Sequence, residues 1–274
     1  MLINKIHYSL NKRRAEFISA KPFPYIVLEK FLTTDTFKKI AKELNQKKIT
    51  LGKSFNSNVE ANKSISLNTN LSNTLINIIN ELNSPEWVNS LKDLTGIVDI
   101  TGTKNGNSML ANYHEMKTNG ILGSHVDHSS EPLDKRAHVL NVIVYLSDNW
   151  NSIYGGDTQL YDRSGQKIVR EVKYKSNRAL IFLHTPFSFH GVSELKNPIE
   201  NPRRTLYVDY YSELISPYSH INMDFPNIWF NHKTTFKLKN KIDYFKPNNL
   251  NYLRNLIEYS FNKKFVEIKN IFRK

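Results

Sequence analysis

Three residues of the chain have the chemical types and the spacing of a metal-binding set. His125 and Asp127 are separated by one residue in the run ILGSHVDHSS. Alternate side chains of a β-strand share a face, so an imidazole nitrogen and a carboxylate oxygen would project together toward one divalent ion. A third ligand must come from elsewhere, and His190 is the best candidate because it ends an apolar, strand-like run and precedes a glycine. Two histidines and one carboxylate on one side of a metal leave open positions opposite them.

The remaining histidines are interpreted as residues that do not bind the metal. His128 falls on the opposite face from Asp127 if the strand continues, so we expect it to be solvated or to support the ligands. The others have no partner at ligand spacing, and we expect them at the surface or hydrogen-bonded in the core. They are His114, His138, His184 and His220.

A second group of residues has the chemistry of a carboxylate anchor. In the run NPRRTLYVDYYS, strand alternation places Arg203 and Thr205 on one face. A guanidinium offers two parallel N–H donors to a carboxylate, and a hydroxyl two positions further on offers a third. Arg204 lies on the opposite face and is the alternative anchor, but the alternation and the threonine favour Arg203.

The segments that must position these residues have the pattern of short β-strands. From about residue 97, runs of β-branched and aromatic residues are separated by Gly, Asn, Asp and Pro. Such spacing is typical of an all-β sandwich or barrel. The runs are SMLANYHEM, HVLNVIVYLSD, DTQLYD, RALIFLH and RRTLYVDYYS.

The segments on either side of these strands are predicted to be largely helical. The clearest helix has Ser84 as its cap, Pro85 at its first position and Gly96 after its last turn. We expect a strand within 22–32, a helix near 35–46 capped by Thr33 or Thr34, a loop or irregular strand over 47–70, and further helices over 72–83 and 247–261. We find no internal repeat and no long linker, so we divide one continuous domain into an N-terminal region (residues 1–96), a core (97–212) and a C-terminal extension (213–274).

The composition excludes several kinds of chemistry. The 274 residues include no cysteine, which rules out disulfides, thiolate zinc sites and cysteine nucleophiles. The N-terminal run has no apolar stretch long enough for a signal peptide, and the most apolar runs are too short to span a bilayer. We therefore expect a cytoplasmic protein without a membrane partner. The sequence carries no signal for the oligomeric state.

The net charge of +13 is concentrated near the C-terminus. Residues 231–274 contain eleven Lys and Arg against three Asp and Glu, which gives a net charge of +8. A basic surface can indicate an anionic partner such as nucleic acid. The whole chain is rich in Lys, Asn and Ile, however, and we favour a compositional origin of the charge.

Four segments in chain order are similar to those of 2-oxoglutarate/iron(II)-dependent oxygenases of the prolyl-4-hydroxylase-like branch. The resemblance covers about 97–212, and PFPYIVLEKFL with the helix after it also fits this branch. It implies a double-stranded β-helix, a cupin-like jelly roll that is mainly β with flanking helices (α+β). The four segments are ANYHEMKTNGILGSHVDHS, LNVIVYLSDNWNSIYGGDTQLYD, NRALIFLHTPFSFHGVSEL and RRTLYVDYY.

The resemblance also implies a role for each site residue. Arg203 would bind the distal carboxylate of 2-oxoglutarate with help from Thr205, although an insertion after His190 keeps Arg204 open as the anchor. Tyr113 and Tyr145 would reach the same molecule. Asn141 shares a strand face with Tyr145, so it is expected to point into the same pocket. No catalytic residue beyond the metal ligands is implied, and the iron(II) ligands would be His125, Asp127 and His190.

The reaction that the resemblance implies is hydroxylation of a C–H bond in a small molecule or a peptidyl residue. Iron(II), 2-oxoglutarate and O2 would be required, ascorbate would stimulate, and succinate and CO2 would be released. The presence of Asp127 favours hydroxylation over halogenation, for which related enzymes carry a small residue there. Two alternatives are a nucleic-acid demethylase and a cupin-like metal protein without oxygenase activity. The excess charge lies away from the motif strands, and the triad with Arg203 is complete, so neither alternative is favoured.

Overall fold

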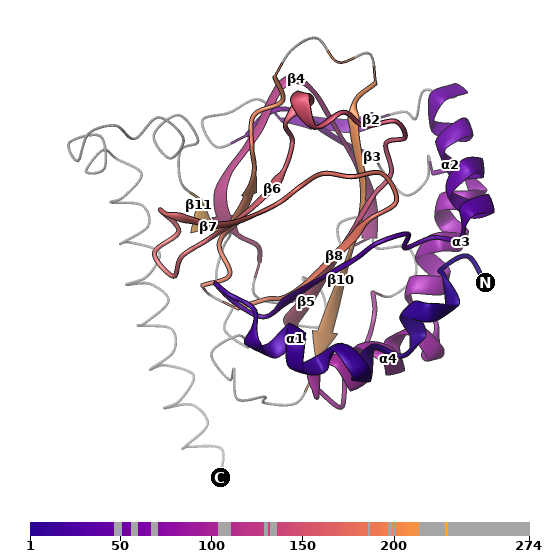
Figure 1. Ribbon diagram of the computed structural model, residues 1–274, viewed down its shortest axis with the longest axis vertical. Helices are drawn as coiled ribbons and strands as arrows, with labels where there is room; N and C mark the ends of the chain where they lie inside the picture. The colour runs from indigo at the N-terminus through magenta and orange to yellow at the C-terminus, as the bar shows by residue number, and fades with distance from the viewer. Residues whose placement is uncertain are drawn as a thin grey trace.

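The chain folds into an antiparallel sheet that curls into a jelly roll (Figure 1). The computed structural model describes residues 1–46, 51–55, 60–66, 71–103, 111–128, 131, 136–185, 187–196, 199, 201–213 and 228–229. The strands are β1 Tyr25–Leu28, β2 Leu51–Phe55, β3 Glu60–Ser66, β4 Ala111–Val126, β5 Ala137–Tyr145, β6 Thr158–Tyr161, β7 Ile168–Val172, β8 Ala179–Leu183, β9 His190–Val192, β10 Arg203–Ser212 and β11 Ile228–Trp229. The main path of the sheet runs β1-β8-β5-β10-β4-β9-β6-β7.

The long strand β4 connects the two halves of the roll. Its first half pairs with β10, where His114 lies opposite Thr205. Its last residues pair with the short strand β9, where His125 lies opposite His190. Along its other edge β4 pairs with β3 and, at its end, with β11. Strand β4 therefore connects the end of the roll that holds Arg203 to the end that holds the His-x-Asp motif.

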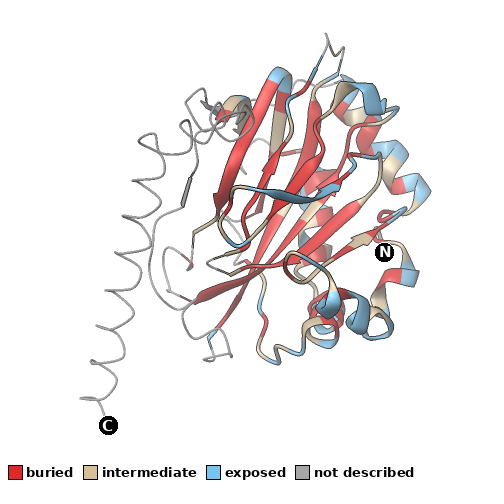
Figure 2. Ribbon diagram, turned by 60° about the vertical axis from the view of Figure 1, so that its left-hand side comes forward, coloured by how far each residue is buried: buried red, intermediate tan, exposed pale blue. Residues whose placement is uncertain are grey.

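Four helices cover the outer face of the sheet formed by β1, β8, β5, β10 and β4, and Figure 1 shows them together on one side of the roll. They bury a core that includes Trp87, Val144 and Leu206, and Trp87 Nε1 donates to Tyr210 Oη across 3.0 Å. Figure 2 shows buried strands and helices with exposed outer faces. The helices are α1 Arg14–Ser19, α2 Thr34–Gln46, α3 Asn73–Leu82 and α4 Pro85–Thr95, with 3-10 turns η1 Lys5–Tyr8, η2 Leu10–Arg13 and η4 Ser152–Tyr154.

The predicted helices of the N-terminal region are confirmed, together with their caps. Thr33 Oγ1 accepts a hydrogen bond from the backbone N–H of Thr36 at the start of α2. The Ser84 side chain caps α4, and Gly96 ends that helix with a φ of 80°, a left-handed conformation that glycine adopts without steric cost. The 3-10 turns and α1 were not predicted, because short turns leave no periodic pattern.

Within the predicted segment 47–70, the described residues 51–55 and 60–66 are strands, which agrees with the irregular-strand form of the prediction. β2 and β3 form an antiparallel pair that extends the sheet beyond β4, and both of the pairings made by β3 contain register shifts. Asn62 has a φ of 50° at the shift against β4. The bulges explain why no clean period-two pattern is visible there.

The fold class predicted from the sequence, a mainly β jelly roll with flanking helices, is confirmed. The division into 1–96, 97–212 and 213–274 stays a prediction, and the predicted helix over 247–261 lies outside the described residues. Within the described part of the chain, no helix is both long enough and apolar enough to cross a bilayer.

Candidate active site

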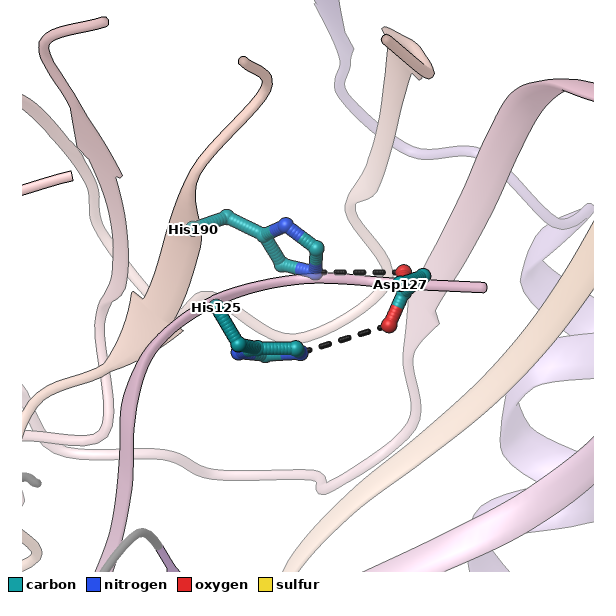
Figure 3. A group of neighbouring side chains, drawn as sticks. All are labelled: His125, Asp127 and His190. Atoms are coloured by element: carbon teal, nitrogen blue, oxygen red, sulfur yellow. Dashed lines mark ion pairs between the residues drawn. The ribbon is translucent and has the colours of Figure 1, made fainter. Parts of the chain in front are cut away.

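His125, Asp127 and His190 converge at the end of β4. His125 and His190 face each other across β4 and β9 with ring centroids 4.3 Å apart, and Asp127 follows directly after the strand. His125 Nε2 lies 3.3 Å from Asp127 Oδ1, and His190 Nε2 lies 3.4 Å from Asp127 Oδ2. Figure 3 shows both imidazole rings turned toward the carboxylate. These three residues can hold one metal ion, since their ligand atoms all lie within 4.8 Å of one another.

The hydrogen bonds of the two histidines prepare Nε2 for a metal. Nδ1 of His125 lies 2.9 Å from the carbonyl oxygen of Gly123, and Nδ1 of His190 lies 3.0 Å from that of Ser188. A carbonyl oxygen only accepts, so Nδ1 carries the proton and Nε2 of the neutral ring presents a lone pair. With Nε2 unprotonated, both rings face the Asp127 carboxylate as a metal ligand would. The donor set fits a divalent transition metal.

Electrostatics keep these groups in the ionisation states that bind a metal. Burial, together with His190, lowers the pKa of His125 below its usual value, so its ring is neutral at neutral pH. Burial alone would raise the pKa of Asp127, but His190 and His125 outweigh it and hold that pKa well below the usual range. An ionised carboxylate beside the neutral imidazole of His125 is the ligand state that a metal needs, because protons compete with the metal.

Arg203 lies on the inner face of the sheet, the face opposite the helices, where it is almost fully buried. Its Nε donates to the carbonyl oxygen of Gly156 across 2.7 Å, and Nη2 lies 3.4 Å from Thr158 Oγ1. The guanidinium carbon lies 4.7 Å from the ring centre of Tyr174 and 5.5 Å from that of Tyr145. Burial lowers the pKa of Arg203 from its usual value, although nearby groups oppose this. Within the described part of the chain, Arg203 forms no ion pair, so a buried cation is held ready for an anion.

Arg204 points the other way, as strand alternation predicts. Its side chain lies on the helix-covered face, where Nη1 donates to Asn45 Oδ1 of α2 and Nε lies 3.7 Å from Glu115 Oε1. Of the two candidate anchors, the structure brings only Arg203 to the inner face. Thr205 lies beside it there, opposite Tyr145 in the β5 register.

Tyr145 lies at this end of the inner face, as expected, with two partners that the sequence did not reveal. Tyr145 Oη and Thr158 Oγ1 are 2.7 Å apart, and the rings of Tyr145 and Tyr174 stack with centroids 4.6 Å apart. Burial raises the pKa of Tyr145 to about 12, so the phenol keeps its proton. Thr158 directly follows the GGD turn, which is the signal that could have identified it. Tyr174 lies in a segment without a comparable motif.

The structure does not bring Tyr113 to this site, which corrects the expectation for that residue. Tyr113 lies opposite Leu206 in the register, so both point into the core beneath the helices, and its hydroxyl donates to Glu115 across 2.6 Å. His114 takes the inner position opposite Thr205, and its ring lies 4.9 Å from that of Tyr207. The pattern of alternation places only one of two successive residues on each face.

Charged groups from both parts of the site affect the pKa of His114. Burial lowers its pKa well below the usual value, Lys63 and Arg203 lower it further, and Asp127 opposes them. The ring is therefore neutral. No site role was predicted for it from the sequence, because no partner stands at ligand spacing.

Asn141 faces inward as predicted, but its contacts differ from the expected ones. Its amide Nδ2 donates to Asp127 Oδ2 across 2.9 Å and to Asp209 Oδ1 across 3.3 Å. It therefore holds the carboxylate of the triad rather than lying beside Arg203. His138 and His184 are buried and hydrogen-bonded, as predicted for core histidines, while His220 lies outside the described residues.

Comparisons with known proteins agree with this geometry. Residues 109–211 match the profile of the 2OG-Fe(II) oxygenase superfamily, whereas no curated protein sequence matches the chain. A prolyl-4-hydroxylase from Pseudomonas putida is 11% identical over 76% of this chain and 99% of its own, with a TM-score of 0.54. A prolyl hydroxylase from Trichoplax adhaerens, solved with a hypoxia inducible factor peptide fragment, is 16% identical over 76% and 92%, with a TM-score of 0.55. HygX from Streptomyces hygroscopicus, solved with nickel and 2-oxoglutarate, is 10% identical over 81% and 96%, with a TM-score of 0.50.

At these identities the likeness to solved structures establishes the shared fold. The superfamily match adds the chemistry, because the matched segment contains both the triad and Arg203. Residues 109–211, which include the triad and Arg203, are similar to the 2OG-Fe(II) oxygenase superfamily. This match supports a dioxygenase that uses iron(II) and 2-oxoglutarate.

Proposed function

We propose that the protein hydroxylates a C–H bond of a small molecule or a peptidyl residue, and that it converts 2-oxoglutarate to succinate and CO2 in the same cycle. The observation that carries this proposal is the pairing of two features on one inner face. One is a convergent His–Asp–His set, and the other is the buried guanidinium of Arg203, which has no ion pair within the described part of the chain.

In this proposal His125, Asp127 and His190 hold the iron(II). A set of two histidines and one carboxylate would leave the ion free to bind the co-substrate and O2 as well. The chemistry supplied by the bound iron is activation of O2, which couples decarboxylation of 2-oxoglutarate to hydroxylation of the substrate. Asn141 keeps the Asp127 carboxylate in position through its amide hydrogen bond.

Arg203 binds the distal carboxylate of 2-oxoglutarate. A dicarboxylate between the metal and Arg203 neutralises a guanidinium that burial makes costly to leave unpaired. The rings of Tyr145 and Tyr174 exclude water around this charge, which strengthens its attraction for a carboxylate. Gly156 and Thr158 fix the direction of the guanidinium through its Nε and Nη2 atoms.

Thr205 and His114 lie on the inner face, near Arg203 in the β4–β10 register. They lie opposite each other in the β4–β10 register. The neutral ring of His114 adds no charge beside the dianion, and either imidazole nitrogen can take part in a hydrogen bond to it. In this proposal His114, and not Tyr113, contacts 2-oxoglutarate.

The substrate class is supported by what similar folds bind. The Trichoplax adhaerens protein was solved with a peptide fragment, which supports a peptidyl substrate, and HygX was solved with 2-oxoglutarate. The basic segment 231–274 lies outside the described residues, so the nucleic-acid alternative stays a prediction. A steep fall of affinity with rising salt would support it. A cytoplasmic location also stays a prediction.

Turnover of 2-oxoglutarate without added substrate tests the proposal first. Purified protein with iron(II), ascorbate and O2 should form succinate slowly, and candidate peptides or small molecules should accelerate it. Asp127→Ala should abolish succinate formation, while Lys173→Ala, a change at an exposed lysine of the outer surface, should retain it. Succinate formation that persists in Asp127→Ala would contradict the proposal.

A further inference from the structure

A second group of metal-binding side chains lies beside the first and has no role in the proposed reaction. His128 follows the His-x-Asp motif, His138 lies on β5, and Asp209 lies on β10. One ligand atom from each lies within 4.8 Å of the others, as in the first triad. We propose that His128, His138 and Asp209 form a second site for a divalent transition metal ion.

The second group repeats the interatomic spacing of the first. His138 Nε2 lies 3.3 Å from Asp209 Oδ1, and His128 Nε2 lies 3.5 Å from Asp209 Oδ2. The corresponding distances in the first triad are 3.3 Å and 3.4 Å. Ligands at metal distances of about 2.0–2.1 Å in a tetrahedral site stand roughly 3.3–3.4 Å apart, so the histidine–carboxylate distances of both groups are compatible with one shared ion. His128 Nε2 also lies 3.1 Å from Tyr211 Oη, a contact that a bound metal would replace.

The hydrogen bonding of His138 is that of a metal ligand. Its Nδ1 lies 2.9 Å from the carbonyl oxygen of His128, so Nδ1 carries the proton of the neutral ring. Its Nε2 is fully buried, forms no hydrogen bond within the described residues, and faces Asp209 Oδ1. A buried lone pair aimed at a carboxylate is stable only with a cation between the two atoms. The Nδ1 atoms of His125 and His190 make the same kind of bond to backbone carbonyls.

The Asp209 carboxylate is held in place for this role from several sides. Tyr207 Oη and Tyr211 Oη donate to its Oδ2 at 3.2 Å and 3.3 Å, and Asn141 Nδ2 donates to its Oδ1 at 3.3 Å. Hydrogen-bonded ligand carboxylates are typical of protein metal sites. The Asn141 amide also donates to Asp127, so a single side chain bridges the two groups.

Two imidazoles and a carboxylate are donors of a kind that suits zinc, iron, manganese and nickel. An ion at this position would join the segment after β4 to β5 and β10. Through Asn141 it would also fix the orientation of Asp127. We therefore assign the second ion a supporting role, in which it holds the first triad together without contacting the reacting atoms.

A proton is the other cation that could occupy the position. His138 Nε2 faces Asp209 Oδ1 at 3.3 Å, so the carboxylate would also hold a proton on that nitrogen. A metal and a proton differ in one measurable respect, which is the number of ions bound per chain.

The experiment is equilibrium dialysis of the full-length chain against zinc(II) at neutral pH, with zinc counted by mass spectrometry. The wild type should bind two zinc ions per chain. Asp209→Asn and His138→Gln should each bind one, and His125→Ala should also bind one because it removes only the first site. Circular dichroism checks that each variant folds. If the buried variants unfold, His128→Gln replaces them, because this residue is partly exposed and lies outside the strands. It should weaken binding of the second ion.

The inference would be overturned if the wild type bound a single zinc ion, if His125→Ala removed that ion, and if His128→Gln had no effect. The cation at the second position would then be a proton on His138. Zinc X-ray absorption of His125→Ala supplies a check without a buried substitution at the second site. Two imidazole nitrogens in the first coordination shell would support the proposed site, and oxygen ligands alone would overturn it. Because no step requires turnover, failure of this site is distinguishable from failure of the proposed hydroxylase activity.

Discussion

His125 and His190 lie directly opposite each other in the register of β4 and β9, with ring centroids 4.3 Å apart. The approach of the two strands depends on Gly191. A Cβ atom at that position would lie 2.6 Å from the carbonyl oxygen of Leu122 and 3.1 Å from that of Gly123. The third ligand can therefore reach the motif only because the residue after it has no side chain.

Gly191→Ala should weaken metal binding by roughly 10- to 100-fold, the range seen when the support of a metal ligand is removed. The added methyl group forces β9, and with it His190, away from β4. Gly120→Ala is the matched control, because its Cβ would meet the carbonyl oxygen of Lys117 at the same 2.6 Å, while its nearest neighbours belong to β4 and β3 and not to β9. The iron(II) affinity of both variants is measured by competition with a chelator. An equal loss of affinity in the two variants would contradict the role of Gly191.

Arg203→Ala should raise the KM for 2-oxoglutarate by roughly 10- to 100-fold, because it removes a charge-assisted contact worth about 1.5–3 kcal/mol. Arg204→Ala is the control. It disturbs the contacts to Asn45 and Glu115 on the helix-covered face and should leave this KM nearly unchanged. Initial rates at varied 2-oxoglutarate measure both. A larger KM effect of Arg204→Ala would show that the anchor is assigned to the wrong residue.

Gly156→Ala should also raise the KM for 2-oxoglutarate, through crowding of the anchor. A Cβ at Gly156 would lie 2.9 Å from Arg203 Cδ, and its φ of 75° disfavours any side chain. Gly165→Ala, with a φ of 72° in the turn between β6 and β7, imposes the same backbone strain away from Arg203. Both variants should lose stability, by about 1–2 kcal/mol, but only Gly156→Ala should change the KM. A normal KM in Gly156→Ala contradicts the assigned contact.

The stability of the fold should decrease as the pH falls below the usual pKa of histidine. His7 Nε2 donates to the carbonyl oxygen of Glu29, and burial lowers the pKa of the ring. Below about pH 6.5 the unfolded chain takes up a proton here that the folded chain does not, so protonation favours unfolding. Urea unfolding of the metal-free protein between about pH 7.5 and 5.5 should show a weaker pH dependence in His7→Gln, which can keep the donor but does not titrate. Parallel profiles for the two proteins would contradict this.

Sequence alternation succeeded where the strand is regular. Arg203 and Thr205 lie in the regular segment of β10, so counting by two placed them on the inner face correctly. The expectation for Tyr113 came from the resemblance alone. Strand β4 shifts register between Met116 and Ile121 against β3 and between Leu122 and His125 against β9, so counting along it cannot assign a face to Tyr113 or His114.

The triad was predictable because two of its members share one short motif and the third ends a recognisable strand. The second group was not, because His128, His138 and Asp209 come from three separate segments and none has a partner at ligand spacing. Their meeting depends on the neighbouring positions of β5 and β10 in the sheet. The contact of Asn141 with Asp127 was missed for the same reason, since only tertiary structure brings an inward-facing amide to the loop after β4.

The most direct test of the proposed active site is an anaerobic titration of the wild type with iron(II) and 2-oxoglutarate, followed by the visible charge-transfer absorption of the ternary complex. We predict that the band develops with one iron(II) ion and one 2-oxoglutarate per chain. It should be absent in His190→Ala, and in Arg203→Ala it should appear only at much higher 2-oxoglutarate. A band of wild-type strength in His190→Ala, or no band in the wild type, would contradict the assignment.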